Sequence, residues 1–215
     1  MAKEQELADS RVAVSITGDD VEHLQEVIDA AKDERPIQSF LEARPQILAA
    51  LLTGSSRFSI PRPQLGGKLV PDFLISDVDS LGIRWVLVEL ETPISTVTLK
   101  NDNLPDKYAR KGVSQVEEWR NWVQNNLELA RRPPREGGHG LVDIRPRSEG
   151  LVLVGRRARL YDNAELVRHT IRENQHIRVH TYDWLIDRLN GVLSFSGPSG
   201  ANPHLIQPLR DDGAP

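Results

Sequence analysis

Three carboxylates stand where two apolar segments of the chain are interrupted or end. Asp72 interrupts the first segment, and Glu89 and Glu91 flank Leu90 at the end of the second. Side chains alternate between the two faces of a strand, so Glu89 and Glu91 point the same way while Leu90 points into the core. Such acids on paired strands gather hard oxygen ligands in a small volume, which suits Mg²⁺ or Mn²⁺. The spacing therefore predicts a hairpin that carries a divalent-metal site.

The composition is typical of a globular domain without disulfides. Of the 215 residues, 39% are hydrophobic and 27% are charged, and there is no cysteine. The absence of cysteine excludes thiolate zinc sites and leaves carboxylate or histidine ligands. No apolar run approaches the ~20 residues that span a bilayer, and the N-terminal sequence lacks the apolar segment of a signal peptide. We therefore expect a cytoplasmic location and no membrane partner.

Charge is unevenly distributed along the chain, although the net charge is only −4. Acids dominate the first forty residues, whereas arginines cluster later. Their planar guanidinium groups either meet phosphates bidentately or form a solvated surface, and the sequence leaves both interpretations open. The clustered arginines are Arg131, Arg132, Arg135, Arg145, Arg147, Arg156, Arg157 and Arg159.

Hydrophobic periodicity predicts a chain that contains both strands and helices. Asp19 and Asp20 are N-cap candidates for the first helix, and Pro71 indicates an edge strand or a bulge. We expect strands at 11–17, 58–60, 69–75, 83–90, 150–155 and 177–180, and helices at 20–32, 36–44, 46–52, 106–130, 163–173 and 182–189. The predicted organisation is an N-terminal strand and helix extension (1–33), one main domain (34–192) and a flexible C-terminal tail (193–215).

Several polar side chains have both structural and functional interpretations. Glu34 and Glu42 lie on one helix face that is either solvated or reaches the metal site. Gln115 lies on the long helix, where its amide can orient a water or a phosphate. Asp72 could instead cap a turn, and Glu89 could pair with an arginine.

In this order, the expected elements and acids resemble the restriction-endonuclease-like nucleases. The resemblance implies an α/β (α+β) fold with a restriction-endonuclease-like core, a central mixed β-sheet flanked by helices. Within that superfamily the sequence resembles the nuclease domain of the Shedu anti-phage defence proteins, over roughly residues 34–190. The matching segments are PIQSFLEARP at 36–45, PDFLI at 71–75, VELETP at 88–93, QVEEW at 115–119, VLVGR at 152–156 and TYDWL at 181–185.

The resemblance implies a metal-dependent DNA endonuclease that forms a homo-oligomer, a dimer or a tetramer. It implies that Asp72, Glu89 and the carbonyl of Leu90 hold Mg²⁺ or Mn²⁺. It also implies that Gln115 steadies the acids or the scissile phosphate. Either Glu34 or Glu42 would add a ligand for a second ion.

The chain departs from the family pattern where that pattern, PD-(D/E)xK, ends in lysine, because Glu91 stands in its place. Glutamate supplies no positive charge, but it can act as a general base or a further metal ligand. A third carboxylate near the other two should raise at least one carboxyl pKa in the metal-free protein. The alternative function is a catalytically impaired nuclease-fold module that binds DNA or a partner protein. Lysines that could supply the missing charge are Lys68, Lys100, Lys107 and Lys111.

Overall fold

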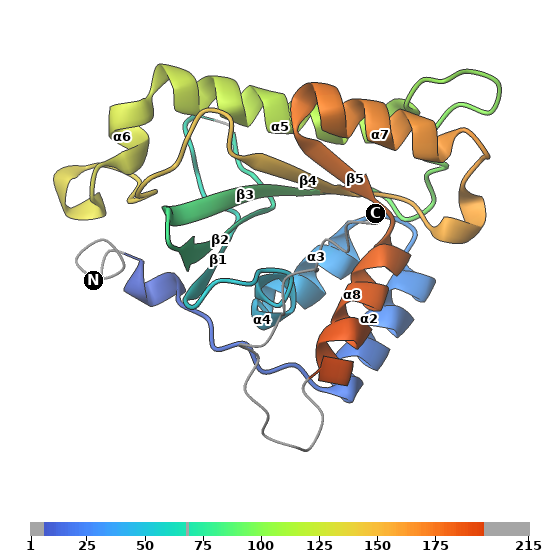
Figure 1. Ribbon diagram of the computed structural model, residues 1–215, viewed down its shortest axis with the longest axis horizontal. Coiled ribbons are helices and arrows are strands. Elements are labelled where there is room, and N and C mark those ends of the chain that lie inside the picture. The colour runs from blue at the N-terminus through green and yellow to red at the C-terminus, as the bar shows by residue number, and fades with distance from the viewer. Residues whose placement is uncertain (1–6, 68, 196–215) are drawn as a thin grey trace, which may run out of the picture.

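The computed structural model describes residues 7–67 and 69–195 of the chain (Figure 1). Strands and helices alternate along it in the order that the periodicity predicts. The strands are β1 Arg57–Pro61, β2 Phe73–Asp79, β3 Gly82–Leu90, β4 Glu149–Leu153 and β5 Ile177–His180. The helices are η1 Ala8–Ser10, α2 Gly18–Ala30, α3 Arg35–Glu42, α4 Gln46–Ala49, α5 Lys107–Asn125, α6 Leu127–Arg131, η2 Pro134–Glu136, η3 Arg157–Arg159, α7 Ala164–Gln175 and α8 Tyr182–Phe195.

One five-stranded mixed sheet forms the centre of the molecule, in the order β1-β2-β3-β4-β5. The first three strands form an antiparallel meander, while β3, β4 and β5 run parallel. Parallel strands need a crossover, and α5 and α7 supply the two crossovers. The sheet with its flanking helices confirms the predicted α+β fold class with a central mixed β-sheet.

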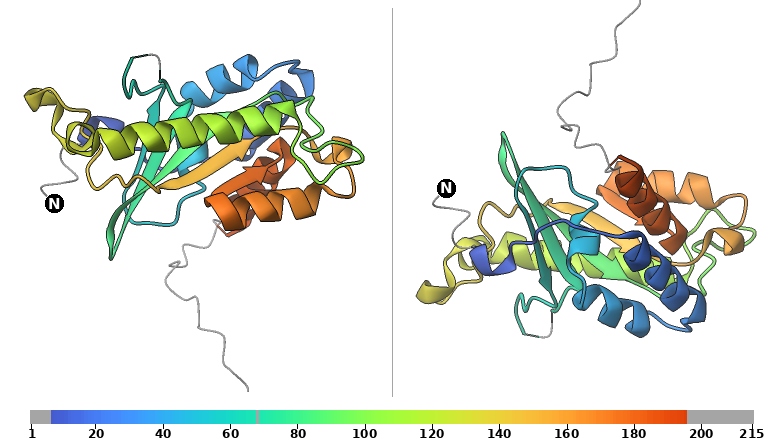
Figure 2. Two further views of the ribbon diagram at one scale, coloured as in Figure 1. Left: turned by 90° about the horizontal axis from the view of Figure 1, so that it is seen from above. Right: turned by 90° about the horizontal axis from the view of Figure 1, so that it is seen from below.

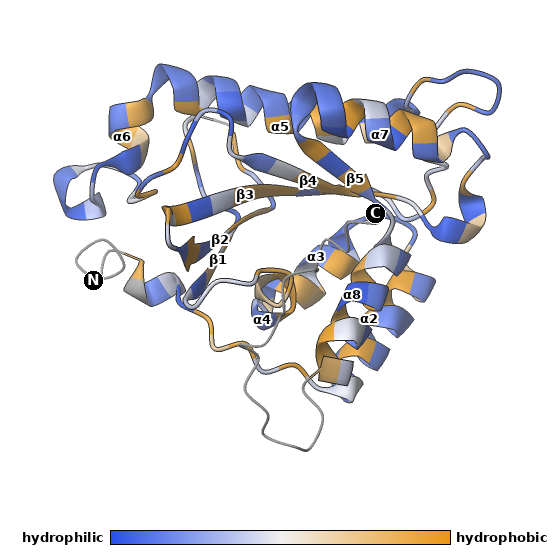
Figure 3. Cartoon of the chain, in the orientation of Figure 1, coloured by the Kyte–Doolittle hydropathy of each residue, from blue (hydrophilic) through white to orange (hydrophobic). Residues whose placement is uncertain are grey.

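Helices cover both faces of the sheet. Helices α5 and α7 lie on one face, and α2, α3, α4 and α8 lie on the other (Figures 1 and 2). Alternate residues of β3 serve the two cores, so Trp85 and Leu87 pack toward α5 while Val86 and Val88 pack toward the other layer. Figure 3 shows apolar residues along the strands, where both helical layers meet them. Within the described ranges, no helix has both the length and the apolar character that crossing a membrane requires.

Local capping explains where the helices begin and break. Thr17, rather than Asp19 or Asp20, is the N-cap of α2, and it forms a capping box with Asp20. Asp106 caps α5 by accepting hydrogen bonds from the backbone N–H groups of residues 108 and 109. The single helix predicted over 106–130 is divided at Asn126, which leaves helical geometry and separates α5 from α6.

The predicted strand at 11–17 is wrong. The segment alternates between exposed and partly buried residues, as a strand would, but only Arg11 forms a bridge, with Phe58. Val14 and Ile16 pack against the core on the α2 side of the sheet. The alternation therefore reflects one-sided packing of an extended segment rather than a hydrogen-bonded ladder.

The start of the second strand also differs from the prediction. Strand β2 begins at Phe73 and lies inside the sheet, so Pro71 and Asp72 precede it and Pro71 forms neither an edge strand nor a bulge. The Asp72 carbonyl accepts the Arg62 N–H at 2.9 Å, which closes the loop that leads into β2.

The C-terminal boundary differs because α8 continues to Phe195. Residue 193, the predicted start of the tail, is therefore helical. The remainder of the predicted tail, 196–215, lies outside the described residues.

Candidate active site

The strand register brings the three acids together. Phe73 pairs with Val88, so Asp72 and Glu89 stand opposite each other one step beyond that pair. The Asp72 carboxylate accepts the Leu90 N–H at 2.8 Å, and the Glu91 N–H continues the parallel pairing with β4. Leu90 is buried, as expected, in the core on the face of the sheet away from α5. Its neighbours Glu89 and Glu91 therefore extend toward α5.

The acid cluster, defined here as Asp72, Glu89 and Glu91, is withdrawn from solvent. Glu89 is 3% exposed and Glu91 is 1% exposed. Burial, followed by the negative charges of Asp72 and Glu91, raises the pKa of Glu89 to about 10. Burial also raises the pKa of Asp72, and the hydrogen bonds from the Leu90 N–H and from Glu89 only partly offset this effect. In the metal-free protein, Glu89 is therefore protonated and its O–H donates a hydrogen bond to the Asp72 carboxylate.

A lysine from helix α5 meets the cluster. Lys111 Nζ lies 2.7 Å from Glu91 Oε1, and the lysine side chain is 56% exposed whereas the glutamate is buried. Burial raises the pKa of Glu91 despite this partner. Of the four lysines considered from the sequence, Lys107 lies over the Tyr108 ring, and Lys68 lies outside the described residues.

Gly112 allows Lys111 to come this close. A β-carbon at Gly112 would lie 2.7 Å from Val152 Cγ1 and 3.3 Å from Glu91 Cγ. Any larger residue would push α5 away from β4 and from the acid cluster. Gly112 thus sets the spacing between α5 and the sheet. At this spacing the preceding residue, Lys111, reaches the acid cluster.

Gln115 lies one turn after Lys111 on α5 and is partly buried. Its Oε1 atom and the Oε2 atom of Glu89 are buried without a hydrogen-bond partner in the described part of the chain. Buried polar atoms usually have a partner, so these oxygens are available to a cation or an ordered water. No group of three or more acid or imidazole side chains within residues 7–67 and 69–195 is arranged to hold a metal ion. The available set is two carboxylates with a neighbouring carbonyl.

Glu34 and Glu42, the acids predicted near the first core helix, differ in their electrostatic effect on the acid cluster. Glu34 immediately precedes α3, and its charge raises the pKa values of Asp72 and Glu91, although it ranks behind burial as a cause. Glu42, at the far end of α3, accepts a hydrogen bond from Gln38 at 3.1 Å. The fold therefore brings Glu34 within electrostatic range of the cluster, and no electrostatic effect of Glu42 on these acids is found in the described part of the chain.

Tyr182 contacts the site and was not singled out from the sequence. Its buried hydroxyl donates to the Glu91 carbonyl at 2.7 Å and thereby holds the backbone just beyond β3. Its position in the TYDWL segment was the available signal, but a tyrosine at the start of a helix is not by itself distinctive.

The tryptophans of α5 have internal roles. Trp119 is 2% exposed, and the Trp122 ring meets His139 edge-on, with 5.1 Å between the ring centroids. Trp119 is therefore a core residue, and Trp122 packs against the same core from a partly buried position.

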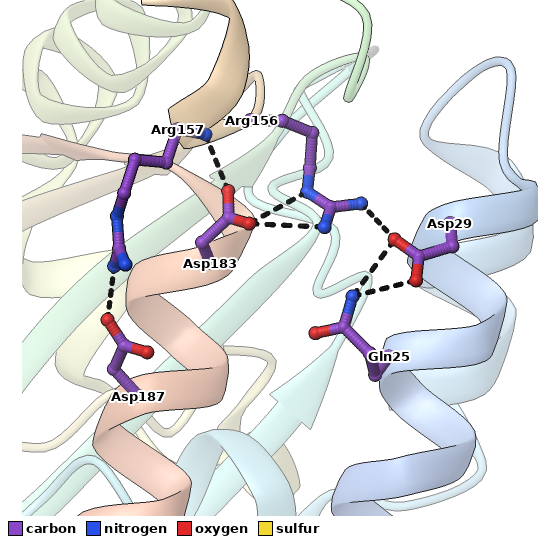
Figure 4. A network of polar contacts seen from close by, with 6 residues as sticks. All are labelled: Gln25, Asp29, Arg156, Arg157, Asp183 and Asp187. Atoms are coloured by element: carbon purple, nitrogen blue, oxygen red, sulfur yellow. Dashed lines mark hydrogen bonds and ion pairs between the residues drawn. The ribbon is translucent and has the colours of Figure 1, made fainter.

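Two of the clustered arginines form an internal ion-pair network. Arg156 links Asp29 of α2 with Asp183 of α8, and Arg157 pairs with Asp187 (Figure 4). The Arg157 N–H also donates to Asp183 at 2.6 Å. These contacts join the loop after β4 to the α2–α8 layer, which explains both guanidinium groups without a phosphate.

The fold is thus an α+β domain in which acids at the end of β3 lie beside a lysine from the crossover helix. The sequence matches the protein family described as "Shedu protein SduA, C-terminal" over residues 31–186. This match covers most of the chain, and the chain belongs to that family. A search of curated proteins found no match.

A solved structure titled "Structure of restriction endonuclease FokI bound to DNA" has a related arrangement. The two chains share 15% sequence identity, and their superposition has a TM-score of 0.44. The similarity covers 91% of this chain but 30% of the other, so the chain spans about a third of the length of that structure.

Proposed function

We propose that the protein is a divalent-metal-dependent DNA endonuclease of the Shedu anti-phage type. The observation that carries the proposal is the acid cluster, in which Glu89 and Glu91 are buried and Lys111 Nζ lies 2.7 Å from Glu91 Oε1 on the α5 side. Membership of the Shedu family supports the same activity.

The donor set suits a hard cation. Asp72, Glu89 and the Leu90 carbonyl would hold Mg²⁺ or Mn²⁺, and Glu34 is the better placed acid for a second ion. The unpartnered Oε2 of Glu89 is consistent with this assignment. When bound, such a cation neutralises phosphate charge and lowers the pKa of a water. Because Glu89 is protonated in the metal-free protein, binding should release a proton.

Lys111 is proposed to supply the positive charge that the family pattern places at position 91. Its ammonium is held by Glu91 yet remains more than half exposed, so it can also meet a phosphate oxygen at the surface of the cluster. Glu91 then acts as a positioning residue for the lysine. Gln115, one turn along α5, would direct its free Oε1 to a water or to the cluster.

Cleavage of linear and plasmid DNA, with Mg²⁺ or Mn²⁺ and with EDTA, tests this function. Asp72→Asn should abolish cleavage and Mn²⁺ binding measured by calorimetry, while Lys111→Met should lower the cleavage rate by about 10²–10³-fold. Lys107→Met is the matched control, because it removes the same charge from an exposed position one turn earlier. Equal cleavage by wild type and Asp72→Asn would refute the proposal.

A charge exchange tests the role of the ion pair separately. Glu91→Lys alone places two ammonium groups together and should impair cleavage. The double variant Glu91→Lys/Lys111→Glu restores one charge of each sign and should recover part of the rate. If Glu91→Lys alone raises cleavage, the natural site is impaired and Lys111 does not replace the motif lysine.

A second candidate is a non-catalytic nuclease-fold module that binds DNA or a partner protein. It is favoured by Glu91 at the lysine position and by the small number of clustered acids within the described ranges. Intact DNA affinity without divalent-ion binding would support it. Homo-oligomerisation and a cytoplasmic location stay predictions, and light scattering at micromolar concentration tests the first.

A further inference from the structure

A second charged site lies at the opposite end of the parallel strands. Arg147, Arg172, His176 and Arg178, together with Glu149, line a cavity of about 400 Å³. Glu149 pairs with Arg178, whereas no ion pair of Arg147 or Arg172 is found within the described residues. Three arginines thus face one glutamate, and the cavity, called here the arginine pocket, has an excess of positive charge.

A buried arginine holds the walls of the arginine pocket. Arg120 of α5 is 5% exposed, and its guanidinium donates to the carbonyls of Ser148, Gln175 and His176. Ser148 follows Arg147, so these bonds fix both loops that bear pocket side chains. The pocket is therefore supported from behind by a buried side chain.

The same bonds remove an obstacle to anion binding. Helix α7 ends at Gln175, and the carbonyls at a helix C-terminus carry partial negative charge that repels anions. Arg120 engages two of these carbonyls and brings a further positive charge, which Glu117 offsets at 2.9 Å. His176 caps the helix in a left-handed conformation with φ of 54° and faces the pocket.

Positive charge continues beyond the pocket along β5. Burial, and then the charges of Arg178, Arg168, Arg172 and Arg188, lower the pKa of His180 to about 3. These arginines come from α7, β5 and α8, so the charge extends over three elements. Several guanidinium groups spread over three elements suit a polyanion better than a single small anion.

The arginine pocket is separate from the acid cluster. Glu149 pairs with Val86, three residues before Glu89, which is on the order of 10 Å along the strand. Arg178 stands opposite Leu151 in the register and therefore extends to the face away from α5, whereas Glu89 extends toward α5. A ligand in the arginine pocket thus contacts no member of the acid cluster.

From this geometry we infer that the arginine pocket is a binding site for backbone phosphates of nucleic acid, outside the catalytic centre. The inference rests on the proposed function in that the polyanion is the DNA substrate. The site adds affinity and leaves the chemistry to the acid cluster.

Equilibrium binding of a fluorescent DNA duplex, measured by anisotropy in EDTA over a salt series, tests the inference without cleavage. Arg147→Ala/Arg172→Ala should weaken binding on the order of tenfold. The slope of log affinity against log salt should become shallower by about 1.8, since two phosphate contacts are lost. Arg147→Lys/Arg172→Lys keeps both charges and should retain the slope.

The matched control is Arg132→Ala/Arg159→Ala, which removes two exposed arginines away from the pocket. It should change affinity less than the pocket variant and leave most of the salt slope. Equal losses in both variants, no loss in the pocket variant, or no DNA binding by wild type would overturn the inference. Asp72→Asn separates the two proposals: it should bind DNA normally but not cleave it. Suppose that neither wild type nor any variant cleaves DNA, and that only the pocket variant loses DNA affinity. In that case the nuclease proposal fails and the inference about the arginine pocket stands.

Discussion

Replacing Glu89 with glutamine should remove a large part of the pH dependence of stability in the metal-free protein. The pKa of Glu89 is raised to about 10, mainly by burial and then by Asp72 and Glu91, from an ordinary value of 4.5. Between these two pH values the folded state holds a proton that the unfolded state has lost. Stability from this group is therefore fully present below pH 4.5 and is lost as pH rises toward 10.

The size of the effect follows from linkage. One extra proton bound by the folded state lowers the free energy of unfolding by about 1.4 kcal/mol for each pH unit. From pH 6 to pH 8 the loss is about 3 kcal/mol, which corresponds to roughly 6–12 °C in Tm for a chain of this size. Glutamine resembles the protonated acid and does not titrate, so Glu89→Gln should lack this contribution.

Thermal unfolding in EDTA at pH 6, 7 and 8, followed by circular dichroism, measures the two slopes. Glu118→Gln is the control, since that glutamate is exposed on α5 and should leave the slope unchanged. Wild type should lose stability more steeply than Glu89→Gln, and the variant should be the more stable protein at pH 8. Parallel slopes for the two proteins would refute the assignment of a proton to Glu89.

Four further variants test packing and polar contacts at the site and in the α2–α8 layer. Gly112→Ala should lower the free energy of unfolding in urea by about 1–3 kcal/mol, because the new Cβ would lie 2.7 Å from Val152. Gly191→Ala is the control: its Cβ would stand in open space on α8, and the change should raise the free energy of unfolding by about 0.5–1 kcal/mol. The reverse order would contradict the close approach of α5. Arg156→Met should cost about 1 kcal/mol by chemical denaturation, because it breaks the two partly exposed pairs of Arg156 in Figure 4, and an unchanged midpoint would exclude a structural role. Tyr182→Phe leaves the Glu91 carbonyl without its donor and should cost about 1–3 kcal/mol, so an unaltered midpoint would show that water replaces the hydroxyl.

Patterns within one element were the most predictable. Alternation along β3 is enough to put Glu89 and Glu91 on one side and Leu90 on the other, because a strand repeats every two residues. Helical periodicity likewise located α5 and α7. The segment at 11–17 shows the limit: alternation reports which side is buried, and the neighbouring chain decides whether a ladder forms.

Charged side chains were less predictable because their partners are remote in the sequence. Arg156 and Arg157 looked like candidate phosphate ligands, but they pair with acids of α2 and α8. The arginine pocket combines Arg147 with Arg172 and Arg178, which lie outside the cluster noted from the sequence. Charge composition alone does not distinguish these outcomes.

The sequence by itself determined the three acids, the face on which two of them stand and the family to which the chain belongs. Only the tertiary structure decided which of four lysines meets Glu91 and which helix acid approaches the cluster. The physical reason is that strand alternation is local, whereas the 2.7 Å contact of Lys111 depends on how closely α5 packs on the sheet. That spacing is set at Gly112, where side chains from β4 and from the end of β3 leave no room for a β-carbon.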